Sequence, residues 1–244
     1  MRHPKANLLL KANLLSDKLQ LEATALSPGL CLIFDMDGVI VDSNPVHRQA
    51  WAAFNRSFGV ETTEDMFRRM YGRRNDEIVR DFFGEGLTPQ EIAARGAAKE
   101  KLYRAMLENR IEEILVPGVR AFLERLCGVP KALATNGEPA NVDFLLDGAG
   151  LRNCFRAVVD GTQVRYPKPH PEIYLRAADL LGADPAECVV FEDSDTGVQA
   201  ALGAGMRVVL VSTTHGNLPG VSLSIDNFLS RELTPWLAAQ GRSA

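Results

Sequence analysis

The sequence predicts an α/β protein whose core is a doubly wound parallel sheet, with a helical domain inserted into it. Three observations support this prediction. Short apolar runs alternate with helical segments through most of the 244 residues, a long stretch after the first run is helical throughout, and several runs end in polar or acidic residues. Such alternation is typical of parallel sheets with helices on both faces. Ligands of these sheets bind beyond the carboxyl ends of the strands, where polar residues are expected.

The first predicted strand is the apolar run Leu30–Phe34, and Gly38 allows the chain to turn sharply soon after it. A helical region over 46–114 follows. Its first helix shows apolar residues at four-residue steps, namely Val46, Ala50, Phe54 and Phe58, with Trp51 beside them. We therefore expect a small helical cap over 46–114, inserted between core segments 30–45 and 115–244.

Two proline-containing segments border the predicted cap, and hinges are expected near 43–45 and 116–118. After the second hinge, strands and helices alternate to the end of the chain. The predicted elements are helices at 119–127, 139–149, 171–182 and 196–204, strands at 130–134, 156–159, 188–191 and 206–211, then a short strand and a helix near 227–239.

The first 29 residues form an N-terminal extension. A Lys-Ala-Asn-Leu-Leu sequence occurs twice, at 5–9 and 11–15, which is too short to be an architectural repeat. Lys11, Asp17 and Lys18 interrupt the segment, whereas a signal peptide needs an unbroken apolar region. Since no stretch approaches the roughly 20 apolar residues of a membrane helix, no membrane association is expected.

Charge and cysteine usage predict a cytoplasmic protein with no nucleic-acid partner. The net charge is −4, and the lysines and arginines are dispersed, which gives no basic surface for a nucleic-acid partner. The four cysteines are far apart in sequence, so we expect reduced thiols rather than a disulfide or zinc site. The sequence does not predict the oligomeric state.

Asp35 and Asp37 directly follow the first predicted strand. Two neighbouring carboxylates repel each other unless a cation or a proton separates them. Mg²⁺ is a suitable cation, because it prefers oxygen ligands and is held by one or two carboxylates together with substrate phosphates. The alternative interpretation is a pair of solvated loop aspartates, since short motifs often occur by chance.

Three later segments also end in groups suited to phosphate or metal. Thr135 and Asn136 follow the second core strand, and Lys168 lies between two prolines that restrict the local backbone. A lysine ammonium is a compact charge that can bind a phosphate oxygen. Glu192 and Asp193 follow a further apolar run, and a helix start comes after them. A second acidic cluster at a second strand end completes a possible metal site.

The ordered set Asp-Met-Asp-Gly, Thr-Asn, Lys-Pro-His-Pro and Glu-Asp-Ser-Asp-Thr-Gly resembles the four motifs of the haloacid dehalogenase (HAD) superfamily, over roughly residues 30 to 215. The resemblance implies a Rossmann-like HAD core. It also implies roles for individual residues: Asp35 as nucleophile, Asp37 as general acid/base, Thr135 as phosphate-binding hydroxyl, Lys168 as charge-neutralising lysine, and Asp35, Asp37, Glu192 and Asp193 as ligands of Mg²⁺, Asp37 through its backbone carbonyl. Four motifs in order are more specific than any one alone.

This resemblance implies covalent catalysis through an aspartyl-phosphate. A second aspartate at the position of Asp37 is typical of phosphatases and phosphomutases, and dehalogenating members lack it. The helical insertion resembles the cap of the β-phosphoglucomutase-like branch, where a cap covers the site and selects the substrate. In that branch a histidine occupies the position of His47. The alternative is a helix-start histidine that packs or faces solvent.

Further substrate-binding candidates are Arg73, Arg74 and Asn136, and for the two arginines a solvated helix face is an equal alternative. The chain departs from the mutase pattern, because Tyr71 and Asn75 occupy positions that are lysine and arginine in the mutases. We therefore predict a Mg²⁺-dependent phosphatase acting on a small phosphorylated metabolite, with a sugar phosphate as the best substrate. The alternatives are a β-phosphoglucomutase that interconverts β-glucose 1-phosphate and glucose 6-phosphate, and a non-catalytic binding protein on the same fold.

Overall fold

A computed structural model of the chain describes residue 26 and residues 29–240. At its centre is a six-stranded sheet in the order β3-β2-β1-β4-β5-β6, in which every neighbouring pair is parallel. The strands are β1 (Cys31–Phe34), β2 (Lys131–Ala134), β3 (Ala157–Val159), β4 (Cys188–Glu192), β5 (Arg207–Val211) and β6 (Leu223–Ile225). The predicted doubly wound sheet is confirmed, and its strand order reverses between β1 and β4.

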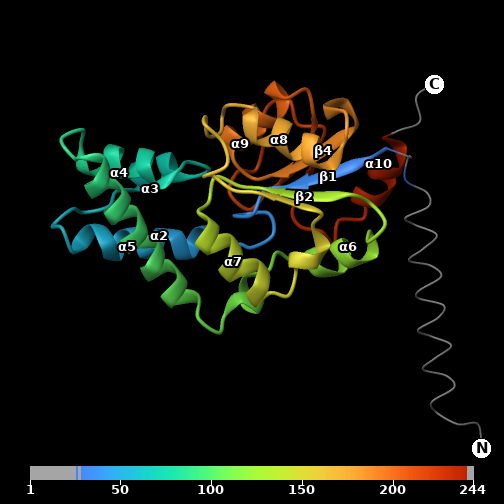
Figure 1. The fold of residues 1–244 in the computed structure, drawn as a ribbon. Helices are drawn as coiled ribbons and strands as arrows, with labels where there is room; N and C mark the ends of the chain where they lie inside the picture. Colours follow the sequence, from blue (N-terminus) through green and yellow to red (C-terminus); the bar gives the residue numbers. More distant parts are fainter. Residues whose placement is uncertain (1–25, 27–28, 241–244) are drawn as a thin grey trace, which may run out of the picture.

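Helices cover both faces of this sheet (Figure 1). Helices α8 and α9 lie on one face, and α6, α7 and α10 contribute to the core on the other. The helices of this sheet unit are α6 (Val119–Arg125), α7 (Pro139–Gly148), α8 (Glu172–Leu181), α9 (Asp195–Gly203) and α10 (Leu233–Ala239), with short 3-10 turns η1 (Ile111–Ile114), η2 (Arg152–Cys154) and η3 (Pro185–Glu187).

Strand β1 is buried on both faces because its side chains alternate between two hydrophobic clusters. Leu32 and Phe34 pack into the cluster below α6 and α7, and Cys31 and Ile33 pack into the cluster below α8 and α9. Phe34 stacks on Phe191 of β4 with ring centroids 4.6 Å apart. Strands that bury both faces read as continuous apolar runs, which explains why this strand was predictable.

Four helices form a separate group beside the sheet, here called the helical unit (residues 44–107). They are α2 (Asn44–Arg56), α3 (Glu64–Met70), α4 (Asn75–Phe83) and α5 (Pro89–Leu107), and they lie at one end of the molecule in Figure 1. Trp51, Phe67, Val79 and Phe82 belong to a hydrophobic cluster inside this unit. The unit therefore has a core of its own. Its first helix begins two residues before the predicted start of the insertion.

The prediction that Phe58 lies on one helical face with Val46, Ala50 and Phe54 is wrong. Helix α2 ends at Arg56, and the chain then turns through Gly59, which has a positive φ of 71°. Phe58 is 48% exposed and lies against Phe54 and Phe83 at the end of the unit. A four-residue spacing cannot indicate where a helix stops, and here the spacing continued past its end.

The two connections between the units run side by side. Asp42 N donates to Ile114 O at 2.7 Å, and Val116 N donates to Ile40 O at 3.0 Å. These bonds flank an antiparallel bridge between Val41 and Leu115. The entry to the helical unit and the exit from it are therefore joined to each other by backbone hydrogen bonds.

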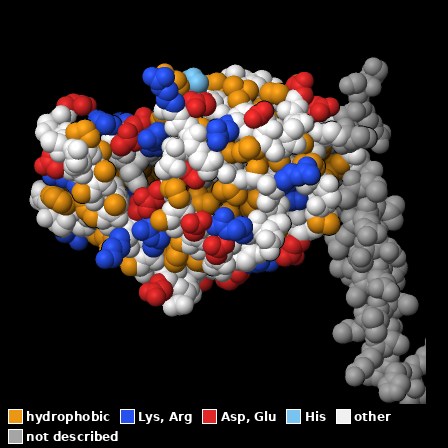
Figure 2. Space-filling view, in the orientation of Figure 1, with side chains coloured by type: hydrophobic (Ala, Val, Ile, Leu, Met, Phe, Trp, Pro, Cys, Tyr) orange, Lys and Arg blue, Asp and Glu red, His pale blue; other side chains and the backbone are white. Residues whose placement is uncertain are grey.

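The described part of the chain contains no helix that is both long and apolar enough to cross a membrane. On the face shown in Figure 2, lysine and arginine side chains are interspersed with aspartate and glutamate. The predicted N-terminal extension falls outside the described residues, apart from residues 26 and 29. All four cysteines are free thiols.

Candidate active site

Three neighbouring strands, β2, β1 and β4, deliver the predicted site residues to one edge of the sheet. Thr135 follows β2, Asp35 follows β1, and Glu192 ends β4. The backbone continues the sheet one residue further, since Asp35 N donates to Phe191 O and Thr135 N donates to Val159 O, both at 3.0 Å. These side chains therefore lie next to one another at the carboxyl edge of the sheet, where open α/β sheets bind their ligands.

Lys168 joins two of these strand ends from a loop that precedes α8. Its Nζ donates to Asp35 Oδ1 and to Glu192 Oε1, both at 2.7 Å, and the side chain is buried. Burial alone would lower the pKa of Lys168, but the carboxylates of Asp35 and Glu192 raise it above its ordinary value. The lysine is therefore a buried permanent cation held against Asp35.

Glu192 is a fully engaged buried carboxylate. Its Oε1 accepts from Lys168 and from Tyr174 OH at 2.8 Å, and its Oε2 accepts from Asp193 N and from Ser194 N and Oγ. Burial opposes ionisation, but Lys168 and these hydrogen bonds hold the pKa of Glu192 below its ordinary value. This carboxylate orients Lys168 and also fixes the turn that presents Asp193.

Asp35, Glu192 and Asp193 bring carboxylate oxygens within 4.8 Å of one another. Burial raises the pKa of Asp35 to about 7, against the opposing effect of Lys168, and Glu192 adds to the rise. Burial, Glu192 and Asp35 together raise the pKa of Asp193 well above its ordinary value. Three buried carboxylates thus share one lysine, and a further cation would relieve their repulsion. An all-oxygen donor set fits a hard divalent cation, so these residues could hold a metal ion.

Gly38 sits against this acidic cluster, which leads to a testable prediction. Its φ is +79°, and a Cβ at this position would lie 1.9 Å from Asp193 Oδ2. We expect Gly38→Ala to displace Asp193 and to weaken metal binding by at least about tenfold, because metal sites depend on correctly placed ligands. Isothermal titration with Mg²⁺ measures this change. Gly86→Ala, in an open position on the helical unit, is the control, and an unchanged metal affinity in Gly38→Ala would contradict the prediction.

Asp37 faces the helical unit. Its Oδ1 accepts from Ser43 Oγ at 2.5 Å and lies 3.2 Å from His47 Nε2. Burial would raise the pKa of Asp37, but His47 and the hydrogen bonds from His47 and Ser43 lower it below its ordinary value. Asp37 is therefore ionised in the ligand-free site, with His47 directly beside it.

His47 is the start of a polar chain through the helical unit. Lys99 Nζ lies 2.9 Å from His47 Nδ1 and 2.6 Å from Glu100 Oε1. A lysine ammonium can only donate, so Nδ1 accepts and Nε2 carries the proton that faces Asp37. Tyr103 stacks on the imidazole with ring centroids 3.9 Å apart. Tyr103 and Lys99 together fix the orientation and tautomer of His47.

Of the other predicted substrate-binding residues, Asn136 and Arg73 line the cavity and Arg74 does not. Asn136 joins the two units, because its Nδ2 donates to Gly72 O at 2.8 Å and its Oδ1 accepts from Lys168 N at 3.3 Å. Arg73 lines the cavity above Asp35 and pairs with Asp81 at 3.1 Å.

Sequence reasoning missed several residues of this site. They are Ser43, Asn44, Lys99, Glu100, Asn141, Tyr174 and Thr214, of which Asn44 and Thr214 donate to Asp193 Oδ2. Lys99 and Glu100 are adjacent charges within a helix, a pattern that usually marks a solvated face. The available signal was weak. Tyr103 lies three residues after Glu100 and four after Lys99, and Leu107 lies four residues further on, which is the spacing of one helix face.

A cavity of about 70 Å³ lies between the units, with Asp35 and Lys168 on one side and Trp51, Lys99 and Glu100 on the other. Ligand pockets are typically about 300–1,000 Å³. The space is therefore smaller than a typical ligand pocket, and the helical unit lies close to the strand ends in this structure.

Comparison with known proteins connects this site to one family. A model of the haloacid dehalogenase-like hydrolases matches residues 30–205. The fructose-1-phosphate phosphatase YqaB of Escherichia coli is 36% identical over 179 residues, which cover 73% of this chain and 94% of that protein. The β-phosphoglucomutase of Bacillus subtilis is 30% identical over 186 residues, which cover 73% of this chain and 81% of the mutase.

Among solved structures, the crystal structure of β-phosphoglucomutase from Clostridium difficile superposes with a TM-score of 0.75. The match covers 85% of this chain and 96% of that one, at 23% identity. At this identity the similarity shows a shared fold and nothing more. The sheet and the helical unit are thus arranged as in an enzyme structure of the same architecture.

Proposed function

The chain belongs to the haloacid dehalogenase-like hydrolases, and from this membership we propose that it is a Mg²⁺-dependent phosphatase that hydrolyses a small sugar phosphate. One observation carries the proposal. Asp35 and Asp37 lie at one strand end, with Lys168 bonded to the first and His47 beside the second. A nucleophile, a proton-transfer group and a charge-neutralising cation are thus assembled around one cavity.

In the proposed mechanism the Asp35 carboxylate attacks phosphorus, the bond to the ester oxygen breaks, and the leaving oxygen takes a proton from Asp37. Water then attacks the phosphorus of the aspartyl-phosphate and gives its proton to Asp37, which releases phosphate and regenerates Asp35. A bound phosphate dianion raises the pKa of nearby carboxyls, which supports protonation of Asp37 before ester cleavage. The Nε2–H of His47 holds the Asp37 carboxylate in position.

Charge neutralisation dominates phosphoryl transfer. Lys168 provides one positive charge, and Thr135 and the loop around Asn136 are placed to contact phosphate oxygens. Asp35, Asp193 and the backbone carbonyl of Asp37 would hold Mg²⁺, which would neutralise negative charge on the phosphoryl oxygens. Glu192 was expected as a further ligand, but its two oxygens already accept five hydrogen bonds, so it would act beside the ion by holding Lys168 and the turn before Asp193. We propose that the region 46–114 acts as a cap on the core segments 30–45 and 115–244.

Hydrolysis is favoured over a mutase reaction by the cavity wall. Tyr71 and Asn75 line the cavity at the positions that the mutases occupy with lysine and arginine. Neither side chain carries a positive charge at neutral pH, whereas a mutase must hold a second phosphate group while its bisphosphate intermediate turns around. The relatives include both phosphatases and mutases. Arg73 also lines the cavity but is paired with Asp81, so this wall supports the phosphatase reaction.

The test is phosphate release from a panel of sugar phosphates in the presence of Mg²⁺. Incubation of β-glucose 1-phosphate with a trace of glucose 1,6-bisphosphate is followed by ³¹P NMR in the same series. We expect inorganic phosphate from at least one panel member and at least about a 100-fold loss in EDTA that added Mg²⁺ restores. Formation of glucose 6-phosphate instead would establish the mutase reaction, and full activity in EDTA would exclude the metal.

We also propose that the enzyme acts in the cytoplasm. Its four cysteines are free, and two of them, Cys31 and Cys188, are buried side by side on β1 and β4. Reduced thiols are normal in the cytoplasm. Fractionation of the producing cells, followed by immunodetection of the protein, tests this location.

A further inference from the structure

The side of the cavity formed by the helical unit contains a buried carboxylate, Glu100. This residue lies on α5, lines the cavity and is 3% exposed. Its Oε1 accepts from Lys99 Nζ at 2.6 Å and from Asn75 Nδ2 at 2.7 Å, and its Oε2 accepts from Asn141 Nδ2 at 2.7 Å. The carboxylate is therefore fixed in place from three directions, one of which is the sheet unit.

Glu100 is an anion at neutral pH. Burial opposes its ionisation, but the charge of Lys99, the electrostatic effect of His47 and the hydrogen bonds from Lys99 and Asn141 lower the pKa of Glu100 to about 2. A substrate that occupies the cavity thus meets an ionised carboxylate on the wall formed by the helical unit.

The cations on this side of the cavity are already compensated. Lys99 is paired with Glu100, and Arg73 is paired with Asp81. A second anionic group on the substrate would have to give up its water, approach a carboxylate, and compete for cations that have partners. Like charges placed together in an interface are unfavourable, and burial of an uncompensated charge is unfavourable as well.

A hydroxyl group suits the same position. Glu100 Oε2 accepts one hydrogen bond, from Asn141, and a carboxylate oxygen can accept two. A substrate hydroxyl can donate to that remaining site, and its own oxygen can accept from a neighbouring amide. Sites that bind hydroxyl groups through buried polar residues discriminate strongly against analogues that cannot make these bonds.

We propose that Glu100 is a specificity-determining residue that restricts the site to phosphate monoesters of uncharged polyols and excludes substrates with a second phosphate or a carboxylate. This inference rests on the proposed phosphatase function. It narrows the proposed substrates to those with a single anionic group, and it assigns the discrimination against other substrates to Glu100 of α5.

The test uses two matched substrate pairs. Fructose 1-phosphate is compared with fructose 1,6-bisphosphate, and glycerol 3-phosphate is compared with 3-phosphoglycerate. For each pair we expect kcat/KM of the wild-type protein to be at least about 100-fold higher for the compound whose only anionic group is one phosphate. In Glu100→Gln, where Lys99 loses its partner charge, we expect this preference to fall by at least about tenfold.

Glu108→Gln is the matched control, because it removes the same charge from an exposed position just after the same helix. Its preference should equal that of the wild-type protein. A wild-type preference near one, or an unchanged preference in a folded Glu100→Gln variant, would overturn the role of Glu100 while phosphate release continued to support the phosphatase. If Glu100→Gln does not fold, a wild-type preference near one still overturns the proposal. Absence of phosphate release from every compound, p-nitrophenyl phosphate included, would overturn the phosphatase function itself.

Discussion

Asp35→Asn is expected to abolish phosphate release and, at the same time, to make the protein more stable. Loss of a catalytic nucleophile lowers kcat by at least about 10⁴-fold. The stability gain follows from the environment of Asp35, which shares a buried space with the carboxylates of Glu192 and Asp193. A neutral amide of the same shape removes one of these repelling charges while it retains a carbonyl oxygen for Lys168.

The stability gain of Asp35→Asn should be large at high pH and small at low pH. The pKa of Asp35 rises on folding, from an ordinary value of 3.8 to about 7. Stability associated with the protonated carboxyl is therefore present below pH 3.8 and is lost as the pH rises toward about 7. We expect the melting temperature of Asp35→Asn to exceed that of the wild-type protein at pH 8, in EDTA, and to approach it near pH 4.

Differential scanning calorimetry and a phosphate-release assay on the same preparation measure both effects. Asp179→Asn, an exposed substitution on α8, is the control and should change neither quantity. An Asp35→Asn protein that keeps its phosphatase activity would disprove the nucleophile assignment. If Asp35→Asn loses activity but has a lower melting temperature than the wild-type protein at pH 8, the carboxylates of this cluster do not repel one another.

Lys168→Met is expected to remove activity as well, but with the opposite effect on stability. The lysine donates to both Asp35 and Glu192 and is buried. Removal of one partner of a buried ion pair costs about 3–5 kcal/mol, because the other charge remains without compensation. In a domain of this size each kcal/mol corresponds to about 2–4 °C, so the melting temperature should fall by about 10 °C. Loss of charge stabilisation should lower kcat by about 10²–10³-fold or more.

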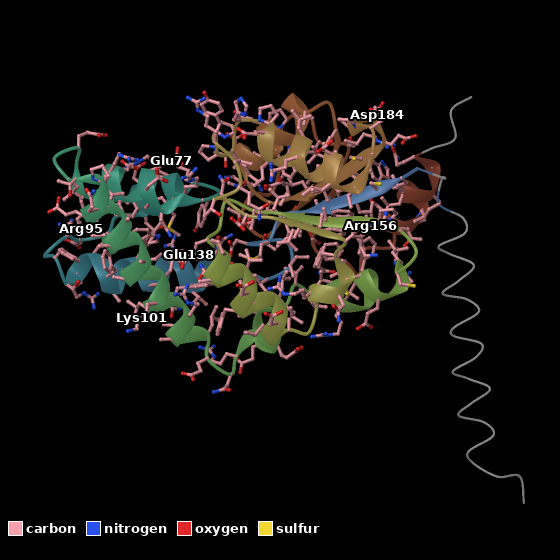
Figure 3. The ribbon with its side chains drawn as sticks, in the orientation of Figure 1. Glu77, Arg95, Lys101, Glu138, Arg156 and Asp184 are labelled. Carbon is pink, nitrogen blue, oxygen red and sulfur yellow. The ribbon has the colours of Figure 1, made fainter. Side chains whose placement is uncertain are left out.

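Lys101→Met provides the comparison. Lys101 lies on the exposed side of α5, where Figure 3 shows it at the surface, and its replacement should alter the melting temperature by less than about 2 °C. A Lys168→Met protein as stable as the wild type would mean that Asp35 and Glu192 are not held by this lysine. The opposite stability changes of Asp35→Asn and Lys168→Met also exclude simple misfolding as a common cause of inactivity.

The sheet and the residues at its carboxyl edge could be predicted because their signals are local. Strand β1 reads as an apolar run, and Asp35 follows it directly. The same holds for Thr135 after β2 and for Glu192 at the end of β4. Strand order and register were not available from the sequence, but parallel strands meet at one edge whatever their order. Placement at that edge was enough to bring these side chains together.

The helical side of the site could not be predicted in the same way. Lys99 and Glu100 are charged neighbours in a helix, and only the packing of α5 against α2 and α7 buries them. Tyr174 contacts Glu192 from α8, a contact between elements that no spacing rule anticipates. The error at Phe58 has a related origin, since helix periodicity reports a repeating face and does not report where the helix ends.

Asn136 connects two processes that are usually separate in an enzyme. One side-chain amide donates to Gly72 of the helical unit and accepts from the backbone of Lys168. If the helical unit moves away from the sheet unit, the bond from Asn136 to Gly72 O breaks, and the amide that also contacts the lysine loop loses one of its partners. Such a motion would expose the space above Asp35 and remove one contact of the lysine loop together. Separation of the two units and loosening of the lysine loop are thus linked through one side chain.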